Sequence, residues 1–210
     1  MFSNRITAGR QLAPLLDKYK RQNAIVLGVP RGGVPIAYII AQTLQLPLSV
    51  ILTKKIGHPD NEEYAVGAVS LTDSYIVPHE NVSEAYLQKT IRKVRARLTE
   101  MQRLYLGNQP PRSVTGKIVI IVDDGIATGN TLLATIKMLR KEHPEKIVVA
   151  VPIASKAAYE LLRQIADEVV VSYIPEIFIG VGAFYDNFSE VSDQEVIKYL
   201  SAAKNSEATN

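Results

Sequence analysis

Two adjacent acids, Asp123 and Asp124, are the residues of this chain best suited to chemistry, and they directly follow an apolar run over residues 118–122. Neighbouring carboxylates repel each other and a phosphate, so they need a hydroxyl-rich or cationic partner, such as the diol of a ribose. Free amides at a helix start, with threonine hydroxyls, form a cradle for a phosphate dianion. The next residues supply such a segment: Gly125, Ile126, Ala127, Thr128, Gly129, Asn130 and Thr131. The pattern predicts a ribose 5′-phosphate site in the crevice where open α/β sheets bind ligands.

Two other interpretations of this segment are weaker. Asp favours the first positions of helices, so Asp123 and Asp124 could be turn and N-cap residues. A cap does not need a double acid followed by this run of small and hydroxyl residues. A nucleoside-triphosphate P-loop places a lysine before its Ser or Thr, and residues 125–131 contain no lysine.

A glycine-rich turn with the sequence Gly-Val-Pro-Arg-Gly-Gly, residues 28–33, follows the first apolar run of the chain. Glycines let the main chain approach a ligand closely, and the planar fork of Arg31 can bind phosphate oxygens. Alone, such a turn is usually a plain connection between a strand and a helix. Beside the acid pair, it predicts a second anion-binding loop.

Residues 118–131 closely resemble the phosphoribosyl pyrophosphate (PRPP) motif of the type I phosphoribosyltransferases, which has four apolar residues, two acids and a Thr/Gly-rich loop. Gly125 stands where that motif commonly has an aliphatic residue, and the run Asp-Asp-Gly-Ile-Ala-Thr-Gly is typical of a poorly characterised branch of the family. The resemblance implies transfer of a 5-phosphoribosyl group from PRPP to a nitrogenous base, with release of pyrophosphate. It also implies Mg²⁺ as the cofactor, held mainly by PRPP oxygens and waters, and a homodimer.

The resemblance also implies roles for particular residues. The pyrophosphate loop comprises Pro30, Arg31, Gly32 and Gly33, with a non-proline cis peptide expected near Arg31. By this resemblance, catalysis rests on Asp123, Asp124 and Arg31, with Lys54 or Lys55. The two lysines follow the second apolar run and should emerge at the same edge of the sheet as the acids. Alternatively, they are ordinary solvated surface lysines. The base would contact aromatic residues of a hood, which could instead form a small local core: Phe178, Phe184 and Tyr185, with Phe188 beside them.

Alternating strand and helix patterns must position these residues. Apolar runs at 24–29, 48–53, 117–122, 146–152 and 168–173 predict a mainly parallel sheet of about five strands, in a doubly wound α/β fold with flanking helices. Helices are expected over 4–20, 34–44, 129–142 and 155–164. We expect a single phosphoribosyltransferase domain over 1–210, with its core at about 20–173.

Other segments depart from this alternation. Residues 54–64 are polar and predict a mobile loop, a lid by resemblance, in which His58, Glu62, Glu63 and Tyr64 are weak candidates for chemistry. Runs at 65–71 and 75–77 predict an antiparallel ribbon, and Asn81 and Glu84 predict the start of a helix over 82–105 that ends at Gly107. The hood is expected at about 174–189, followed by a helix at 193–202 and a frayed tail at 205–210.

Composition excludes several classes of chemistry. The chain has 210 residues, a formal charge of +3, no cysteine and three scattered histidines. Disulfides, thiolate catalysis and cysteine-bound metals are therefore absent, and the small charge gives no argument for a nucleic-acid or membrane partner. Without an apolar signal core or a membrane-length apolar run, a cytoplasmic location is expected.

Two rival functions use the same pocket. A non-catalytic regulator could read PRPP or a nucleotide, although no DNA-binding module is visible in the sequence. A sugar-phosphate hydrolase would release inorganic phosphate without any base. The acceptor base stays open, because the hood and not the PRPP motif selects it.

Overall fold

The central element of the fold is a five-stranded sheet in the order β2-β1-β6-β7-β8, with every neighbouring pair parallel. The computed structural model describes residues 1–77, 79, 81–107 and 109–207. The strands are β1 (Ala24–Gly28), β2 (Leu48–Val50), β6 (Ile118–Val122), β7 (Lys146–Ile153) and β8 (Glu168–Tyr173). Both faces of the sheet are covered, which explains why its strands are continuous apolar runs. The predicted parallel α/β sheet is confirmed.

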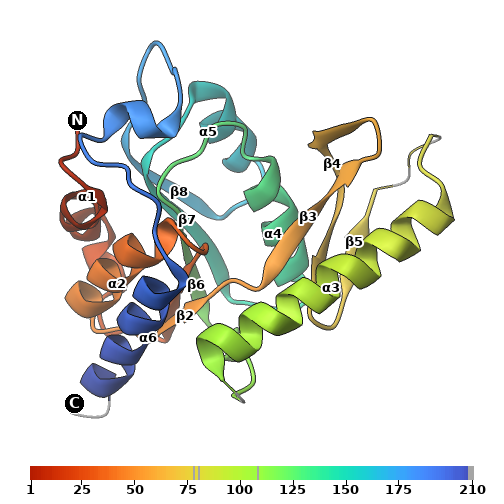
Figure 1. Cartoon of the computed structure of the whole chain (residues 1–210). Coiled ribbons are helices and arrows are strands. Elements are labelled where there is room, and N and C mark those ends of the chain that lie inside the picture. Colours follow the sequence, from red (N-terminus) through yellow and green to blue (C-terminus); the bar gives the residue numbers. More distant parts are fainter. Residues whose placement is uncertain (78, 80, 108, 208–210) are drawn as a thin grey trace.

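Helices cover the two faces of this sheet (Figure 1). One face carries α1 (Arg5–Leu12), α2 (Gly33–Leu44) and α6 (Asp193–Glu207), and the other carries α4 (Asn130–Arg140) and α5 (Lys156–Leu162). The helix predicted over 4–20 is divided, because Ala13–Tyr19 forms the 3₁₀ helix η1 with Pro14 at its start. Proline lacks the N–H that would continue the α-helical ladder. No helix within the described ranges is long and apolar enough to cross a membrane.

A second, antiparallel sheet projects from the edge beside β2 and packs against α3 (Glu84–Leu106) (Figure 1). Its strands are β3 (Thr53–His58), β4 (Asn61–Ser70) and β5 (Ser74–Ile76). The β4–β5 ribbon is as predicted, but the irregular loop predicted over 54–64 is wrong. Ile56 and Val66 are fully buried in the main core, and a register shift at Ile56/Gly57 interrupts the alternation that would have indicated a strand.

Two helix ends also differ from the prediction. Ser83, not Asn81, caps α3, because its hydroxyl accepts the Tyr86 N–H; the helix ends at Gly107 as expected. The tail predicted from 205 is helical as far as Glu207, whose carboxylate pairs with Arg112 at 2.7 Å. Residues 208–210 lie outside the described part of the chain.

Candidate functional site

The acid pair and the glycine-rich turn meet at the carboxyl ends of β1 and β6. Gly28 and Val122 are paired in the sheet, and the Val29 N–H donates to the Val122 carbonyl at 2.8 Å. A Cβ on Gly32 would lie 2.7 Å from Asp124 Cγ, and one on Gly33 would lie 2.8 Å from Asp123 Cα. Only glycine fits at these two positions, so the turn lies directly on the acids. The Pro30–Arg31 peptide is cis, as the family resemblance implies.

A cleft of about 520 Å³ opens in front of this junction. Arg31 extends into it and forms an ion pair with the exposed carboxylate of Glu190; its other terminal nitrogen lies 4.0 Å from Asp193 Oδ1. The lining combines two cations, two acids and apolar side chains of the hood and the segment after it: Arg5, Arg31, Gly32, Asp124, Val181, Phe188, Glu190 and Val191. The cleft therefore offers both anion-binding and apolar contacts.

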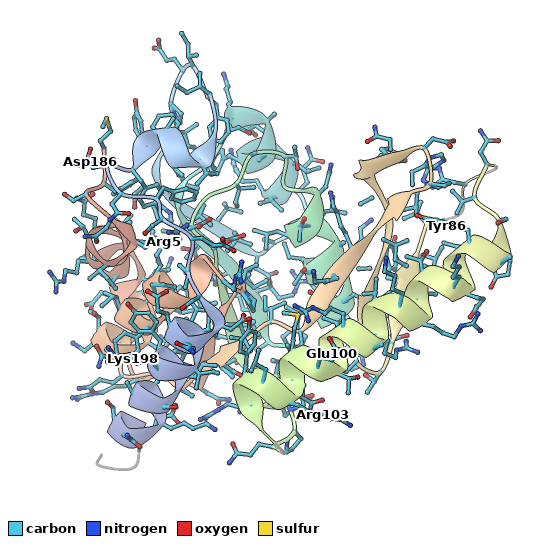
Figure 2. All side chains as sticks on the ribbon, in the orientation of Figure 1. Arg5, Tyr86, Glu100, Arg103, Asp186 and Lys198 are labelled. Carbon is cyan, nitrogen blue, oxygen red and sulfur yellow. The ribbon has the colours of Figure 1, made fainter. Side chains whose placement is uncertain are left out.

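Arg5, in the first turn of α1, is a site residue that the sequence did not indicate. Its Nε and Nη2 donate to Asp124 Oδ2 at 2.9 and 2.8 Å, and its Nη1 donates to the Ser189 carbonyl at 2.7 Å. The guanidinium carbon lies 4.0 Å from the centre of the Phe188 ring. Figure 2 shows Arg5 where α1 meets the segment after the hood. No motif surrounds Arg5 in the sequence, and 119 residues separate it from Asp124.

The two acids differ in their surroundings. Burial raises the pKa of Asp123 well above its usual range, and the adjacent Asp124 charge raises it further. Burial also raises the pKa of Asp124, but hydrogen bonds and charge from Arg5 act against that rise. Asp123 is therefore the member of the pair that more readily takes a proton, because Arg5 opposes protonation of Asp124 by direct contact.

The loop after the acids presents free amides, with one exception. Ile126 donates its N–H to the Ile153 carbonyl at 2.9 Å, so the prediction that its amide binds phosphate is wrong: that amide joins the loop to the end of β7. In the described chain, the N–H groups of residues 125 and 127–131 have no internal acceptor. Ala127, Thr128 and Thr131 are exposed, and Gly129 is the N-cap of α4, with a φ of 76°. These amides can bind an anion at the helix start.

Gly125, which departs from the family motif, has a packing reason. A Cβ there would lie 2.5 Å from Ile153 Cγ2 and 2.9 Å from Val181 Cγ2. The hood thus packs onto the loop at Gly125, a position without a side chain.

Replacing Gly125 with the aliphatic residue common in the motif should therefore destabilise the fold. We expect Gly125→Val to lower the free energy of unfolding by about 1–3 kcal/mol, the usual cost of overpacking, as measured by denaturant titration. Adding Val181→Ala should recover part of that loss. Ala127→Val, at an exposed position of the same loop, is the control and should change stability by less than about 0.5 kcal/mol. Equal losses in both single variants would contradict the packing argument.

Lys54 and Lys55 lie on strand β3 of the second sheet and not in an irregular loop after β2. They pair with Val69 and Ala68 of β4, and no residue of β3 or β4 is among the described residues that line the cleft. The reason is that β2 ends at Val50, after which the chain enters the second sheet and carries the lysines along it. His58 and Tyr64 lie at the tip of that sheet, with ring centres 6.2 Å apart; the side chains of Glu62 and Glu63 lie outside what the structure describes.

The hood aromatics are mostly packed against one another. Tyr185 is only 6% exposed and donates its hydroxyl to the Asp124 carbonyl at 2.7 Å, so the prediction that it stacks on a base is wrong. Burial also raises the pKa of this phenol. Phe178 and Phe184 stack on each other with ring centres 5.9 Å apart, as a local core would. Phe188 is the hood aromatic that lines the cleft.

The fold and the site define an α/β protein with a crevice of free amides, acids and cations at the carboxyl edge of its sheet. The chain matches the phosphoribosyl transferase domain over residues 5–186, and it belongs to that family. This confirms the family resemblance seen in the PRPP motif.

Similar proteins extend over almost the whole chain. "Putative phosphoribosyl transferase Rv0571c" of Mycobacterium tuberculosis is 38% identical over 208 residues, which are 97% of this chain and 47% of that relative. The chain thus spans about half the length of the curated relatives it matches. The crystal structure of TT1426 from Thermus thermophilus has a TM-score of 0.87 at 37% identity, with 95% of this chain and 97% of that chain covered.

Proposed function

We propose that this protein transfers the 5-phosphoribosyl group of PRPP to a nitrogenous base and releases pyrophosphate. The observation that carries the proposal is the contact between the Gly32–Gly33 turn and the acid pair, beside a loop of free amides. PRPP has a 5′-phosphate, a diol and a pyrophosphate in the same order. The amides of residues 127–131 would hold the phosphate, the acids the diol, and Arg31 the pyrophosphate.

Positioning and charge would supply the catalysis. Departure of pyrophosphate leaves positive charge on the ribose, which the Asp124 carboxylate of the acid pair favours, while Arg31 offsets the negative charge that grows on the leaving group. The ring nitrogen of the base then bonds to the sugar carbon that loses the pyrophosphate oxygen. No covalent bond to the protein is needed. Lys54 or Lys55 would add to the positive charge of Arg31, as the family resemblance implies.

Mg²⁺ fits this arrangement as an ion that PRPP brings with it. The described residues contain no group of three or more metal-binding side chains, and Asp124 Oδ2 already accepts two hydrogen bonds from Arg5. Oxygens of PRPP and water would therefore supply most of the ligands that this hard ion prefers. When bound, the ion would neutralise charge on the pyrophosphate. A homodimer in the cytoplasm completes the proposal.

A screen of bases tests the proposal directly. Purine and pyrimidine bases would be mixed in turn with PRPP, Mg²⁺ and the protein, and pyrophosphate release would be measured beside calorimetric binding of PRPP. Release with one class of base supports the transferase. Binding of PRPP without release of pyrophosphate with any of the bases would indicate a regulator. Inorganic phosphate released without a base would indicate a hydrolase.

The ion pair between Arg31 and Glu190 gives a second test. Pyrophosphate would have to displace the Glu190 carboxylate, which is exposed and held by a surface ion pair worth at most about 1 kcal/mol. We therefore expect Glu190→Gln to tighten binding of Mg-pyrophosphate by up to about fivefold in calorimetry. Glu176→Gln, at an exposed position of the hood, is the matched control. Weaker binding by Glu190→Gln would show that this carboxylate assists the site.

A further inference from the structure

Arg5 connects three parts of the site that are far apart in the sequence. It comes from α1, it donates twice to Asp124 Oδ2, and it donates once to the Ser189 carbonyl at the end of the hood. Its guanidinium also covers the Phe188 ring. The residue is only 9% exposed, so these contacts occupy it almost completely. A cation buried to this degree at a cleft has a cost that its partners must offset.

The charges around the pair show what Arg5 does. From α1, Arg5 touches Asp124; from the hood, the neutral Tyr185 phenol donates to the Asp124 carbonyl. Arg31 lies across the cleft but is paired with Glu190 and lies near Asp193. Glu195 of α6 lies close enough for the Arg5 charge to lower its pKa further, below what its Ser192 hydrogen bonds already produce. Arg5 is thus the one cation in direct contact with the acid pair among the described residues.

The hydrogen bonds also fix the shape of the pair. Asp124 is held at its carboxylate by Arg5 and at its carbonyl by Tyr185, and its N–H donates to Asp123 Oδ1 at 2.9 Å. Gly32 packs against the same Asp124 carboxylate, because a Cβ there would lie 2.7 Å from Asp124 Cγ and 3.4 Å from Arg5 Nε. The Asp124 side chain therefore has little freedom to reorient when a ligand enters.

We propose that Arg5 is a positioning residue of this site: it holds Asp124 as a fixed carboxylate against the hood and so determines which acid of the pair can take a proton. The inference rests on the proposed function only for its ligand, PRPP. Without the guanidinium, two adjacent buried carboxyls would share the crevice with no cation in contact. Both would then favour their protonated forms. As the pH falls, the carboxylate that binds the sugar hydroxyls would take up its proton at a higher pH than in the unaltered protein.

The test has one readout without ligand and one with PRPP. The carboxyl carbons of Asp123 and Asp124 would be titrated by NMR in the ligand-free protein, and binding of PRPP with Mg²⁺ would be measured by calorimetry over the same pH range. Arg5→Met removes the charge and keeps much of the side-chain volume. Arg5→Lys keeps the charge without the planar fork, and Arg10→Met, at an exposed position of α1, is the control.

In Arg5→Met, we expect the Asp124 titration to move to higher pH and PRPP affinity to fall at least about tenfold on the acid side, with recovery as pH rises. Arg5→Lys should keep the Asp124 titration near that of the unaltered protein and bind PRPP with intermediate affinity. Arg10→Met should change neither. If Arg5→Met does not fold, a shifted Asp124 titration in Arg5→Lys would overturn the charge argument.

Other outcomes separate the two proposals. An unchanged Asp124 titration in folded Arg5→Met, or tighter PRPP binding, would overturn the role of Arg5; the second result would show that Arg5 competes with the ligand. Failure of the unaltered protein to bind PRPP would contradict the proposed function, while the ligand-free titration would still decide whether Arg5 controls the pair.

Discussion

Turnover should fall at least ~100-fold in the double variant Asp123→Asn with Asp124→Asn, in which both acids become amides. A loss of this size is expected when a preorganised electrostatic group is removed. An amide keeps the size of the carboxyl group but carries no charge to favour a positive ribose. The measurement is steady-state pyrophosphate release with an acceptor found in the base screen. Asp17→Asn, at an exposed position, is the control and should keep full turnover.

The single variants add a check on folding. The pKa of Asp123 is raised in the folded chain, so folding disfavours its ionised form. The free energy of unfolding therefore falls as pH rises through the usual Asp range toward that raised pKa. Asp123→Asn should therefore stabilise the fold at neutral pH. Asp124→Asn should destabilise it, because Arg5 would lose its charged partner. Near-normal turnover in a well-folded double variant would refute the assignment of both acids.

The sequence predicted those parts of the site that lie within one loop. Residues 118–131 carry a strand, two acids and a helix start in one continuous segment, so the local pattern fixes their relative positions. The turn at 28–33 was predicted for the same reason, and the pairing of Gly28 with Val122 brings the two loops together, as parallel strands require.

Contacts between distant segments could not be predicted in this way. Arg5 resembles any other arginine of a surface helix until the fold places it against Asp124. Tyr185 was predicted to stack on a base because it carries an aromatic ring in the hood. Only its burial against Phe2, with ring centres 5.4 Å apart, shows otherwise. In the segment 54–64, Ile56 is the one fully buried side chain described, which is too little for a strand pattern.

The second large effect concerns Arg31, the cation that faces the predicted leaving group. We expect Arg31→Met to lower turnover about 100-fold or more, because a preorganised charge that offsets the pyrophosphate would be lost. Arg31→Lys should recover only part of this activity, since an ammonium cannot bind two phosphate oxygens in the planar, forked geometry of a guanidinium. Both are measured by pyrophosphate release and by calorimetric binding of Mg-pyrophosphate.

The matched control is Arg97→Met on α3, whose exposed side chain pairs with Glu100 at 3.0 Å and is absent from the cleft lining. It removes the same charge from the protein, so a general effect of net charge on an anionic substrate would appear in both variants. Because a mobile surface pair contributes little, Arg97→Met should keep full turnover. If Arg31→Met binds Mg-pyrophosphate as tightly as the unaltered protein, then the turn at 28–33 does not hold the leaving group, and the free amides beside the acid pair would be the only anion site left in the described crevice.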